Sequence, residues 1–142
     1  MRELVQAGAS LDLQNKNLYT TLMLAAVNGH TEIVRELVQA GASLDLQDNA
    51  QSTALMYAEY GGHTEVVREL VQAGASLDLQ DKYQRTALMH AVWNSHAKIV
   101  LELVEAGASP VLKNKGGKTA LQLARQRGHT DTIAVLEAAE AE

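Results

Sequence analysis

Four histidines recur at an interval of 33 residues in this chain, at His30, His63, His96 and His129. Imidazole is a common metal ligand, so such a series first suggests a metal site. One histidine in each of several packed helical units, however, would place neighbouring rings roughly 8–10 Å apart, which is too far for one ion. Each histidine follows glycine or serine at an expected turn, where a ring N–H can donate to a backbone carbonyl. We therefore predict that these histidines are structural and bind no metal.

The segment from Gly116 to Thr119, GGKT, resembles the end of a phosphate-binding loop. Such a loop needs a glycine five residues before Gly117, where this chain has Leu112, and no strand is expected before it. His90 is the only histidine outside the series, and no carboxylate pair or Ser/His/Asp group stands out. The chain has no cysteine that could supply a thiolate. These observations predict a non-enzyme that uses no cofactor.

The composition is that of an ordinary globular protein, with 46% hydrophobic and 20% charged residues. No apolar run approaches the roughly 18 residues of a membrane span, and the first residues lack the apolar core of a signal peptide, so we expect neither membrane insertion nor secretion. The absence of cysteine suits a reducing compartment, which predicts a cytoplasmic (intracellular) location unless the protein is engineered. The net charge of −5 opposes general binding to nucleic acid, although residues 81–130 carry eight basic and three acidic side chains.

A period of 33 residues organises the whole chain. Leu22, Ala25 and Ala26 have helical spacing, Gly29-His30 marks a break, and a second apolar stripe follows. Each unit is therefore predicted to be a helix, a turn and a second helix, which makes the chain all-α. Threonine stands where its oxygen can cap each first helix, and Ala-Gly-Ala-Ser follows each second helix. The threonines are Thr20, Thr53, Thr86 and Thr119, and the glycines are Gly8, Gly41, Gly74 and Gly107.

One full unit has Asp48, Thr53-Ala54-Leu55, Ala58, Gly62-His63, Val66-Val67, Leu70 and Gly74-Ala75 at its recurring positions. With four units in phase, the chain resembles the ankyrin repeat family over essentially its whole length. The resemblance implies an all-α, ankyrin-type helix-turn-helix solenoid with hairpin-like tips. Its single domain, 1–142, would comprise a half repeat (1–14), full repeats at 15–47, 48–80 and 81–113, and a C-terminal capping repeat at 114–142.

Two departures from the family's pattern lie just before and within the start of each first helix. Where the family commonly has Thr-Pro-Leu-His, the histidine is replaced, so we expect some loss of helix capping. Its replacements are Met23, Met56, Met89 and Gln122. The usual turn glycine survives only as Gly117, and if the other turns need a positive φ they are strained. The residues in those turns are Leu18, Gln51 and Gln84.

The thirteen residues RELVQAGASLDLQ occur three times, at 2–14, 35–47 and 68–80. Met1 is in register with Val34, within a second helix, so residues 1–14 correspond to half a repeat. The last unit, in contrast, has the polar outer positions expected of an end repeat. This pattern predicts a segment of a longer array or an engineered protein. Leu4 and Val5, at the uncapped start, are expected to drive weak self-association.

Variation between units is concentrated at the tips and on the inner side of the first helices, which together form the concave surface of an ankyrin array. Four of the five aromatic residues lie at these positions, and Tyr, Trp and Arg are enriched at binding hot spots. The alternative is that these side chains only cover the next repeat, as we expect for Tyr57. The predicted protein-binding residues are Tyr19, Tyr60, Lys82, Tyr83, Arg85, Trp93, Asn94 and Arg127.

These features predict a protein–protein interaction module that binds a protein or peptide in its concave face. A basic group toward the C-terminal end favours a partner with an acidic patch. That group is Lys82, Arg85, Lys115, Lys118, Arg125 and Arg127. The alternative function is a structural piece, such as a folding model or spacer, with no dedicated partner. Nucleic-acid binding by residues 81–130 is a third and weaker hypothesis, and no membrane partner is expected.

Overall fold

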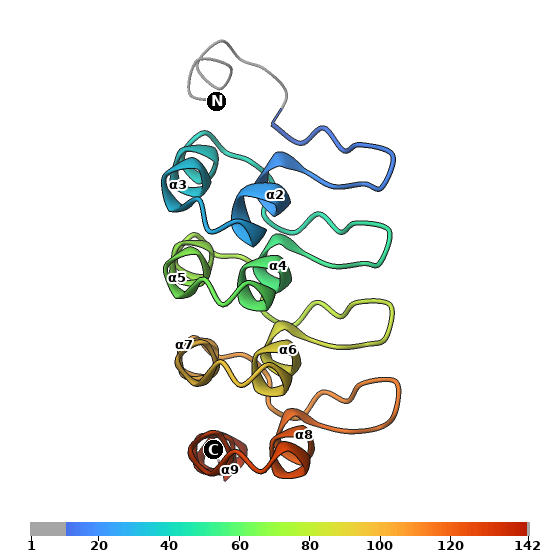
Figure 1. The fold of residues 1–142 in the computed structure, drawn as a ribbon, viewed down its shortest axis with the longest axis vertical. Coiled ribbons are helices and arrows are strands. Elements are labelled where there is room, and N and C mark those ends of the chain that lie inside the picture. The colour runs from blue at the N-terminus through green and yellow to red at the C-terminus, as the bar shows by residue number, and fades with distance from the viewer. Residues whose placement is uncertain (1–10, 142) are drawn as a thin grey trace. The chain divides into compact units, whose positions relative to one another are not determined.

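The computed structural model describes residues 11–141, and every regular element in that range is an α-helix (Figure 1). The chain divides into two compact units, Met1–Ser76 and Leu77–Glu142. The first unit contains α2 (Thr21–Val27), α3 (Thr31–Gln39), α4 (Ala54–Tyr60) and α5 (Thr64–Gln72). The second contains α6 (Ala87–Trp93), α7 (Ala97–Glu105), α8 (Ala120–Arg127) and α9 (Thr130–Ala141). The predicted all-α, helix-turn-helix organisation is confirmed.

The first helix of each pair begins where its threonine predicts. Each threonine side chain accepts a hydrogen bond of 3.1–3.3 Å from the backbone N–H three residues later. The side chains of Met23 and Gln122 in turn accept a hydrogen bond from the backbone N–H of their threonine. These two helices therefore have a capping box although the family's histidine is replaced. The second helices are followed by glycines in the left-handed conformation, as predicted, at Gly41, Gly74 and Gly107.

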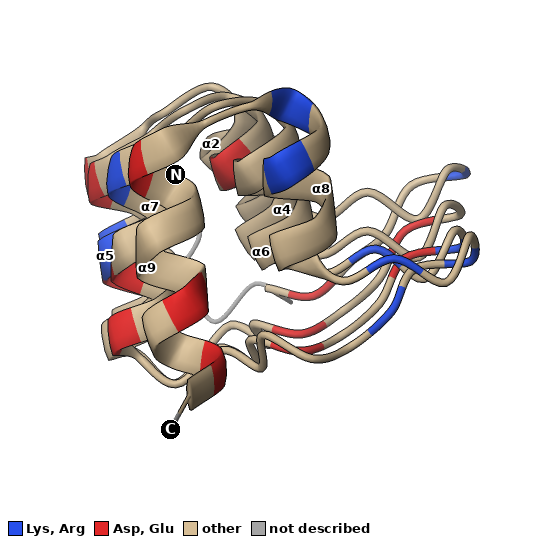
Figure 2. Cartoon of the chain, turned by 90° about the horizontal axis from the view of Figure 1, so that it is seen from below, with Lys and Arg blue, Asp and Glu red and all other residues tan. Residues whose placement is uncertain are grey.

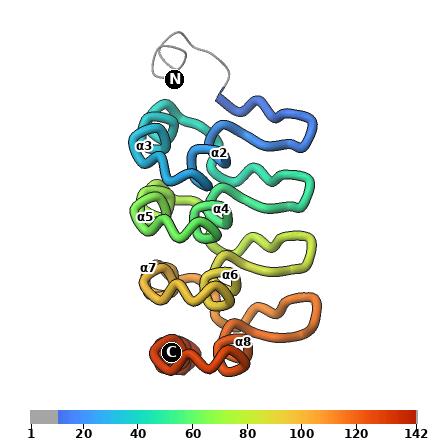
Figure 3. The backbone as a smooth tube through the Cα atoms, in the orientation of Figure 1, coloured from blue at the N-terminus to red at the C-terminus, as the bar shows by residue number. Residues whose placement is uncertain are grey.

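A hairpin-like tip precedes each first helix (Figure 3). In the tip at 81–85, the N–H of Asp81 donates to the carbonyl of Arg85 at 2.9 Å, and the N–H of Gln84 donates back to the carbonyl of Asp81 at 2.8 Å. The fourth residue of each tip has a positive φ, which costs an ordinary L-residue about 1–2 kcal/mol. Leu18, Gln51 and Gln84 have φ of 61–63°. The predicted strain is therefore present in three tips, and Gly117 relieves it in the fourth.

Apolar side chains between the helices form the core of each unit. In the first unit α2 packs on α4 and α3 on α5, and in the second α6 packs on α8 and α7 on α9. Alanines at equivalent positions of the first helices, Ala58, Ala91 and Ala124, are fully buried and allow close helix approach. In each unit the tips project beyond the first helices, with the second helices on the other side (Figure 2). None of the described helices combines the length and the apolar character that a membrane crossing needs.

The copied thirteen-residue segment supplies polar contacts between successive repeats. Asp45 Oδ1 accepts the N–H of Ser76 at 2.9 Å, and its Oδ2 accepts the Ser76 hydroxyl at 2.8 Å. The same backbone bond, at 2.8 Å, joins Asp12 to Ser43 and Asp78 to Ser109. These contacts give a physical reason for keeping the aspartate and the serine identical in each copy.

Most of the predicted half repeat lies outside the described residues, and Leu4 and Val5 lie wholly outside them. The division into repeats at 14, 47, 80 and 113 and the weak self-association stay predictions.

Candidate functional site

Two hairpin-like tips in the second unit are each fixed by one side chain. Asp81 begins the first tip, and its Oδ1 accepts the N–H groups of Tyr83 and Arg85, both at 2.9 Å. Asn114 begins the second tip and accepts the N–H groups of Gly116 and Lys118 at 2.9 and 3.0 Å. An Asp or Asn that bonds its own backbone in this way stabilises a turn locally. These bonds therefore fix the backbone from which the variable side chains of the tips project.

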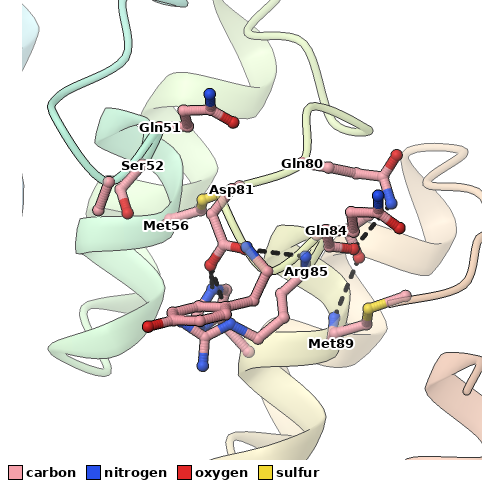
Figure 4. A network of polar contacts seen from close by, with 12 residues as sticks. Gln51, Ser52, Met56, Gln80, Asp81, Gln84, Arg85 and Met89 are labelled. Atoms are coloured by element: carbon pink, nitrogen blue, oxygen red, sulfur yellow. Dashed lines mark hydrogen bonds and ion pairs between the residues drawn. The ribbon is translucent and has the colours of Figure 1, made fainter. Parts of the chain in front are cut away.

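The second carboxylate oxygen of Asp81 joins the first tip to α6. Oδ2 accepts the Nε–H of Arg85 at 2.9 Å (Figure 4) and lies 3.0 Å from Nε2 of His90. The Asp81 side chain is only 1% exposed. Burial acts to raise the pKa of Asp81, but hydrogen bonds from Arg85, His90 and the Tyr83 N–H outweigh it and hold the pKa below its ordinary value. Asp81 is consequently an ionised acceptor at neutral pH.

His90 is a neutral donor in this arrangement. Burial lowers the pKa of His90, and the positive charge of Arg85 lowers it further, against the opposing effect of Asp81. An ionised carboxylate can only accept, so the hydrogen of the neutral ring is assigned to Nε2 and Nδ1 keeps its lone pair. The imidazole thus fastens α6 to the tip through one hydrogen bond.

Two aromatic side chains of the second unit are stacked against cations. Lys82 Nζ lies 5.1 Å and Arg85 Cζ 4.9 Å from the centroid of the Tyr83 ring. Arg127 Cζ lies 4.7 Å from the centroid of Trp93. Contacts of this kind contribute about 0.5–1 kcal/mol at exposed sites. Tyr83 and Trp93 are 48% and 42% exposed, so each presents to solvent an aromatic ring with a positively charged side chain stacked against it. These five residues are named the inner surface below.

A hollow of about 290 Å³ adjoins the inner surface. The tips contribute Arg85 and Asn114 to its lining, α6 contributes Met89, His90 and Trp93, and α8 contributes Leu123. Apolar walls with a few polar groups are typical of binding sites, because the walls hold an apolar group while the donors orient a polar one.

Two of the predicted binding residues lie in the first unit. Tyr19 is half-buried and packs edge-on against Tyr57, with 6.1 Å between the ring centroids and an angle of 86°. The Tyr57 hydroxyl bonds Asp48, and burial together with that carboxylate raises the pKa of Tyr57. This geometry gives Tyr19 a packing contact. Tyr60, the last residue of α4, is 68% exposed.

A family model described as ankyrin repeats in three copies matches residues 1–81 and 40–114. The chain belongs to the ankyrin repeat family. Ankyrin repeats are generally protein–protein interaction modules, and proteins built from them are typically not enzymes. No curated protein matches the chain significantly. The family resemblance drawn from the sequence is confirmed.

Two of the histidines that recur in these ankyrin repeats, His63 and His129, make contacts with the preceding repeat. In the first unit, His63 Nε2 lies 3.0 Å from the carbonyl oxygen of Val27, as the turn position predicts. A Cβ added to Gly29 would come within 2.6 Å of the same ring, so a glycine is required there. In the second unit, His129 Nε2 instead lies 2.7 Å from the hydroxyl of Ser95. Among residues 11–141, no three histidine, aspartate or glutamate side chains gather as a metal site.

The basic residues of the second unit are not all on the inner side. The sequence assigns Arg125 to the inner basic group, and this assignment is wrong, because its guanidinium pairs with Glu137 of α9 at 2.9 Å. Lys118 Nζ donates to Gln126 at 2.9 Å. Figure 2 shows basic residues on the tips and on α8, and acidic residues on α9. Asn94 is the half-buried C-cap of α6, whose N–H donates to carbonyls of that helix.

The bond between Asp81 and His90 is a contact that reasoning from the sequence missed. A signal for it nevertheless exists within the ankyrin repeats. Asp48 and Tyr57 stand at the equivalent positions of the preceding repeat and are also hydrogen-bonded. The other two repeats pair asparagine with leucine at the same spacing, as Asn15 with Leu24 and Asn114 with Leu123. An acid begins the tip only where a polar donor stands nine residues later.

Proposed function

We propose that this ankyrin repeat protein binds a protein or peptide partner through the inner surface of its second unit. The observation that carries the proposal is the pair of exposed aromatic rings, Tyr83 and Trp93, that are stacked against cations. Such side chains offer large contact area and lose little conformational entropy on binding, which is why they dominate binding hot spots. Tyr60, which is more exposed than either, is proposed as a separate contact in the first unit.

The charges of the inner surface favour a partner with an acidic patch. Among residues 11–141, neither Lys82 nor Arg127 forms an ion pair with a carboxylate. Arg85 pairs with Asp81, but the arginine side chain is 44% exposed whereas the aspartate is buried, so the positive group is the one presented to solvent. Complementary charge would accelerate encounter with an acidic partner and reduce its affinity in high salt.

The remaining predicted residues have weaker support as binding residues. Tyr19 is proposed as a packing residue because of its contact with Tyr57. Asn94 is proposed to contribute only at the margin of the interface, because it caps α6. Whether the protein is natural or engineered does not change the proposal, since both would place variable residues on a fixed framework.

The proposal is tested by affinity capture from cell lysate with the full chain and a Tyr83→Ala/Trp93→Ala variant. A protein retained by the parent chain and lost by the variant is the expected result. Tyr60→Ala, measured separately, reports whether the first unit contributes. The matched control is Leu101→Ala/Val111→Ala, which removes two exposed apolar side chains of the second unit outside the inner surface. Equal retention by parent and variant would contradict the proposal, and a partner absent from every lane would favour a structural piece without a partner.

A further inference from the structure

We propose that the hollow beside the inner surface binds one carboxylate side chain, an aspartate or glutamate of the partner, within an otherwise partly apolar segment. The inference rests on the proposed function and specifies which part of the partner enters the site. Its occupant is argued from the charge, the donors and the size of the hollow.

Arg85 is the group that would bind the carboxylate. Its Nε–H is bonded to Asp81 at 2.9 Å, and its guanidinium packs on Tyr83, so the side chain is held from two directions. A guanidinium has five N–H donors, and only the one on Nε is used within residues 11–141. The terminal amino groups are thus available to donate to a carboxylate, the geometry in which arginine binds such groups most strongly.

The electrostatic setting favours a single negative charge. Asp81 is buried and its charge is offset by Arg85, whereas Arg127, stacked on the Trp93 ring that lines the hollow, and Lys82, stacked on Tyr83, add positive charge. His90 is neutral and adds no charge of its own, since burial and Arg85 lower its pKa. A bound carboxylate would therefore meet a net positive environment without having to displace Asp81 from its backbone bonds.

The walls and the volume of the hollow limit what surrounds the carboxylate. Met89, Trp93 and Leu123 are apolar, so the occupant must bring apolar atoms together with its charge. A volume of about 290 Å³ lies just under the range of about 300–1,000 Å³ that is typical of small-molecule pockets. The hollow is therefore sized for one or two side chains of an extended segment.

The experiment uses peptides selected for binding to the full chain. Random dodecapeptides are displayed and enriched on the intact protein, and the enriched sequences are synthesised with each Asp or Glu changed in turn to Asn or Gln. Trp93 is the only tryptophan of the chain and lines the hollow, so its fluorescence reports occupancy directly. The protein variants are Arg85→Gln, Arg85→Lys and, as a control with the same charge change, Arg125→Gln, whose arginine pairs with Glu137 instead.

The expected result is an enriched acidic peptide whose amide version binds about tenfold more weakly, a loss of the size that a charged hydrogen bond gives. Arg85→Gln should cause a similar loss for the acidic peptide and almost none for the amide version, because both changes remove the same contact. Arg85→Lys should restore part of the affinity, which separates loss of the contact from misfolding, and Arg125→Gln should bind like the parent.

Two results would overturn the inference. Enriched peptides that bind equally well as amide versions, or with Arg85→Gln, would refute the carboxylate site and leave protein binding intact. Failure to enrich any peptide that changes the Trp93 fluorescence, together with the absence of any partner captured from lysate, would refute both the carboxylate site and the proposed function.

Discussion

Replacing Asp81 with asparagine leaves an oxygen for the N–H groups of Tyr83 and Arg85 but removes the acceptor that His90 and Arg85 share. The asparagine amide must then turn its NH2 group either toward these side chains, where it meets the Nε–H of Arg85 and, in the Nε2–H tautomer, that of His90, or toward the backbone N–H groups of Tyr83 and Arg85. Donors therefore face donors in both orientations. The bond to Arg85 is half exposed and contributes about 0–1 kcal/mol, whereas the largely buried bond to His90 contributes about 2 kcal/mol. Asp81→Asn should therefore lower the free energy of unfolding by about 2–3 kcal/mol.

His90→Leu should have a smaller effect. It removes one charged hydrogen bond of about 2 kcal/mol but adds a leucine at a position that is only 15% exposed, which returns about half of that loss. We expect a net destabilisation of about 1 kcal/mol. The double variant reproduces the asparagine and leucine found together at Asn114 and Leu123. Because the amide no longer faces a buried ring N–H, the double variant should lose about 1 kcal/mol instead of the 3–4 kcal/mol that additivity gives.

Urea unfolding followed by the fluorescence of Trp93, which lies in α6 beside this contact, measures the four stabilities of the cycle. Asp78→Asn is the matched control, since the same charge is removed from an exposed carboxylate that accepts one backbone N–H at 2.8 Å. Its cost should stay below about 1 kcal/mol. If the double variant is as unstable as the sum of the single variants, Asp81 and His90 are not coupled and the interpretation of the paired substitutions is wrong.

Two further predictions concern turn strain and pH. Gln84→Gly should raise the free energy of unfolding by about 0.5–1 kcal/mol, because the strain energy released at the positive φ of 61° exceeds the cost of the entropy that glycine adds to the unfolded chain. Gln84→Ala, which keeps the strain, should give no gain. Urea titration measures both variants. The pKa of His90 is lower in the folded chain than the ordinary value of 6.5, so as the pH falls below 6.5 the unfolded chain takes up a proton on His90 before the folded chain does. The parent chain should therefore lose more stability between pH 7 and pH 5 than His90→Leu. Parallel stability curves for the two proteins would contradict the assigned direction of the His90 pKa shift.

The fold was predictable because its sequence signals recur in every 33-residue repeat. A single threonine or glycine is weak evidence for a helix boundary, but four threonines and three glycines in register each gave the expected cap or left-handed residue. The strain in the tips was also predictable. The tips keep their shape where glycine is absent, because Asp or Asn at the first position bonds the backbone and holds the fourth residue at positive φ.

The geometry of the candidate site was only partly predictable. Composition and variation pointed to Tyr83, Arg85 and Trp93, but the direction of a side chain depends on neighbours that periodicity does not specify. Arg125 illustrates the limit, because it occupies a first-helix position and yet turns toward Glu137. Predicting the contact of Asp81 with His90 would have required comparing two variable positions at once, since neither position is informative alone.

Variation between repeats is therefore not sufficient evidence of a binding role. The variable positions of Tyr19 and His90 are occupied by side chains that hold the fold, through an aromatic contact and a hydrogen bond. Tyr83 and Trp93 differ from them because their rings stay exposed although each is stacked against a cation. Packing within the chain does not require such a ring to stay open to solvent, whereas a partner does. Exposure combined with immobilisation, more than variability, is what separates the proposed binding residues from the structural ones.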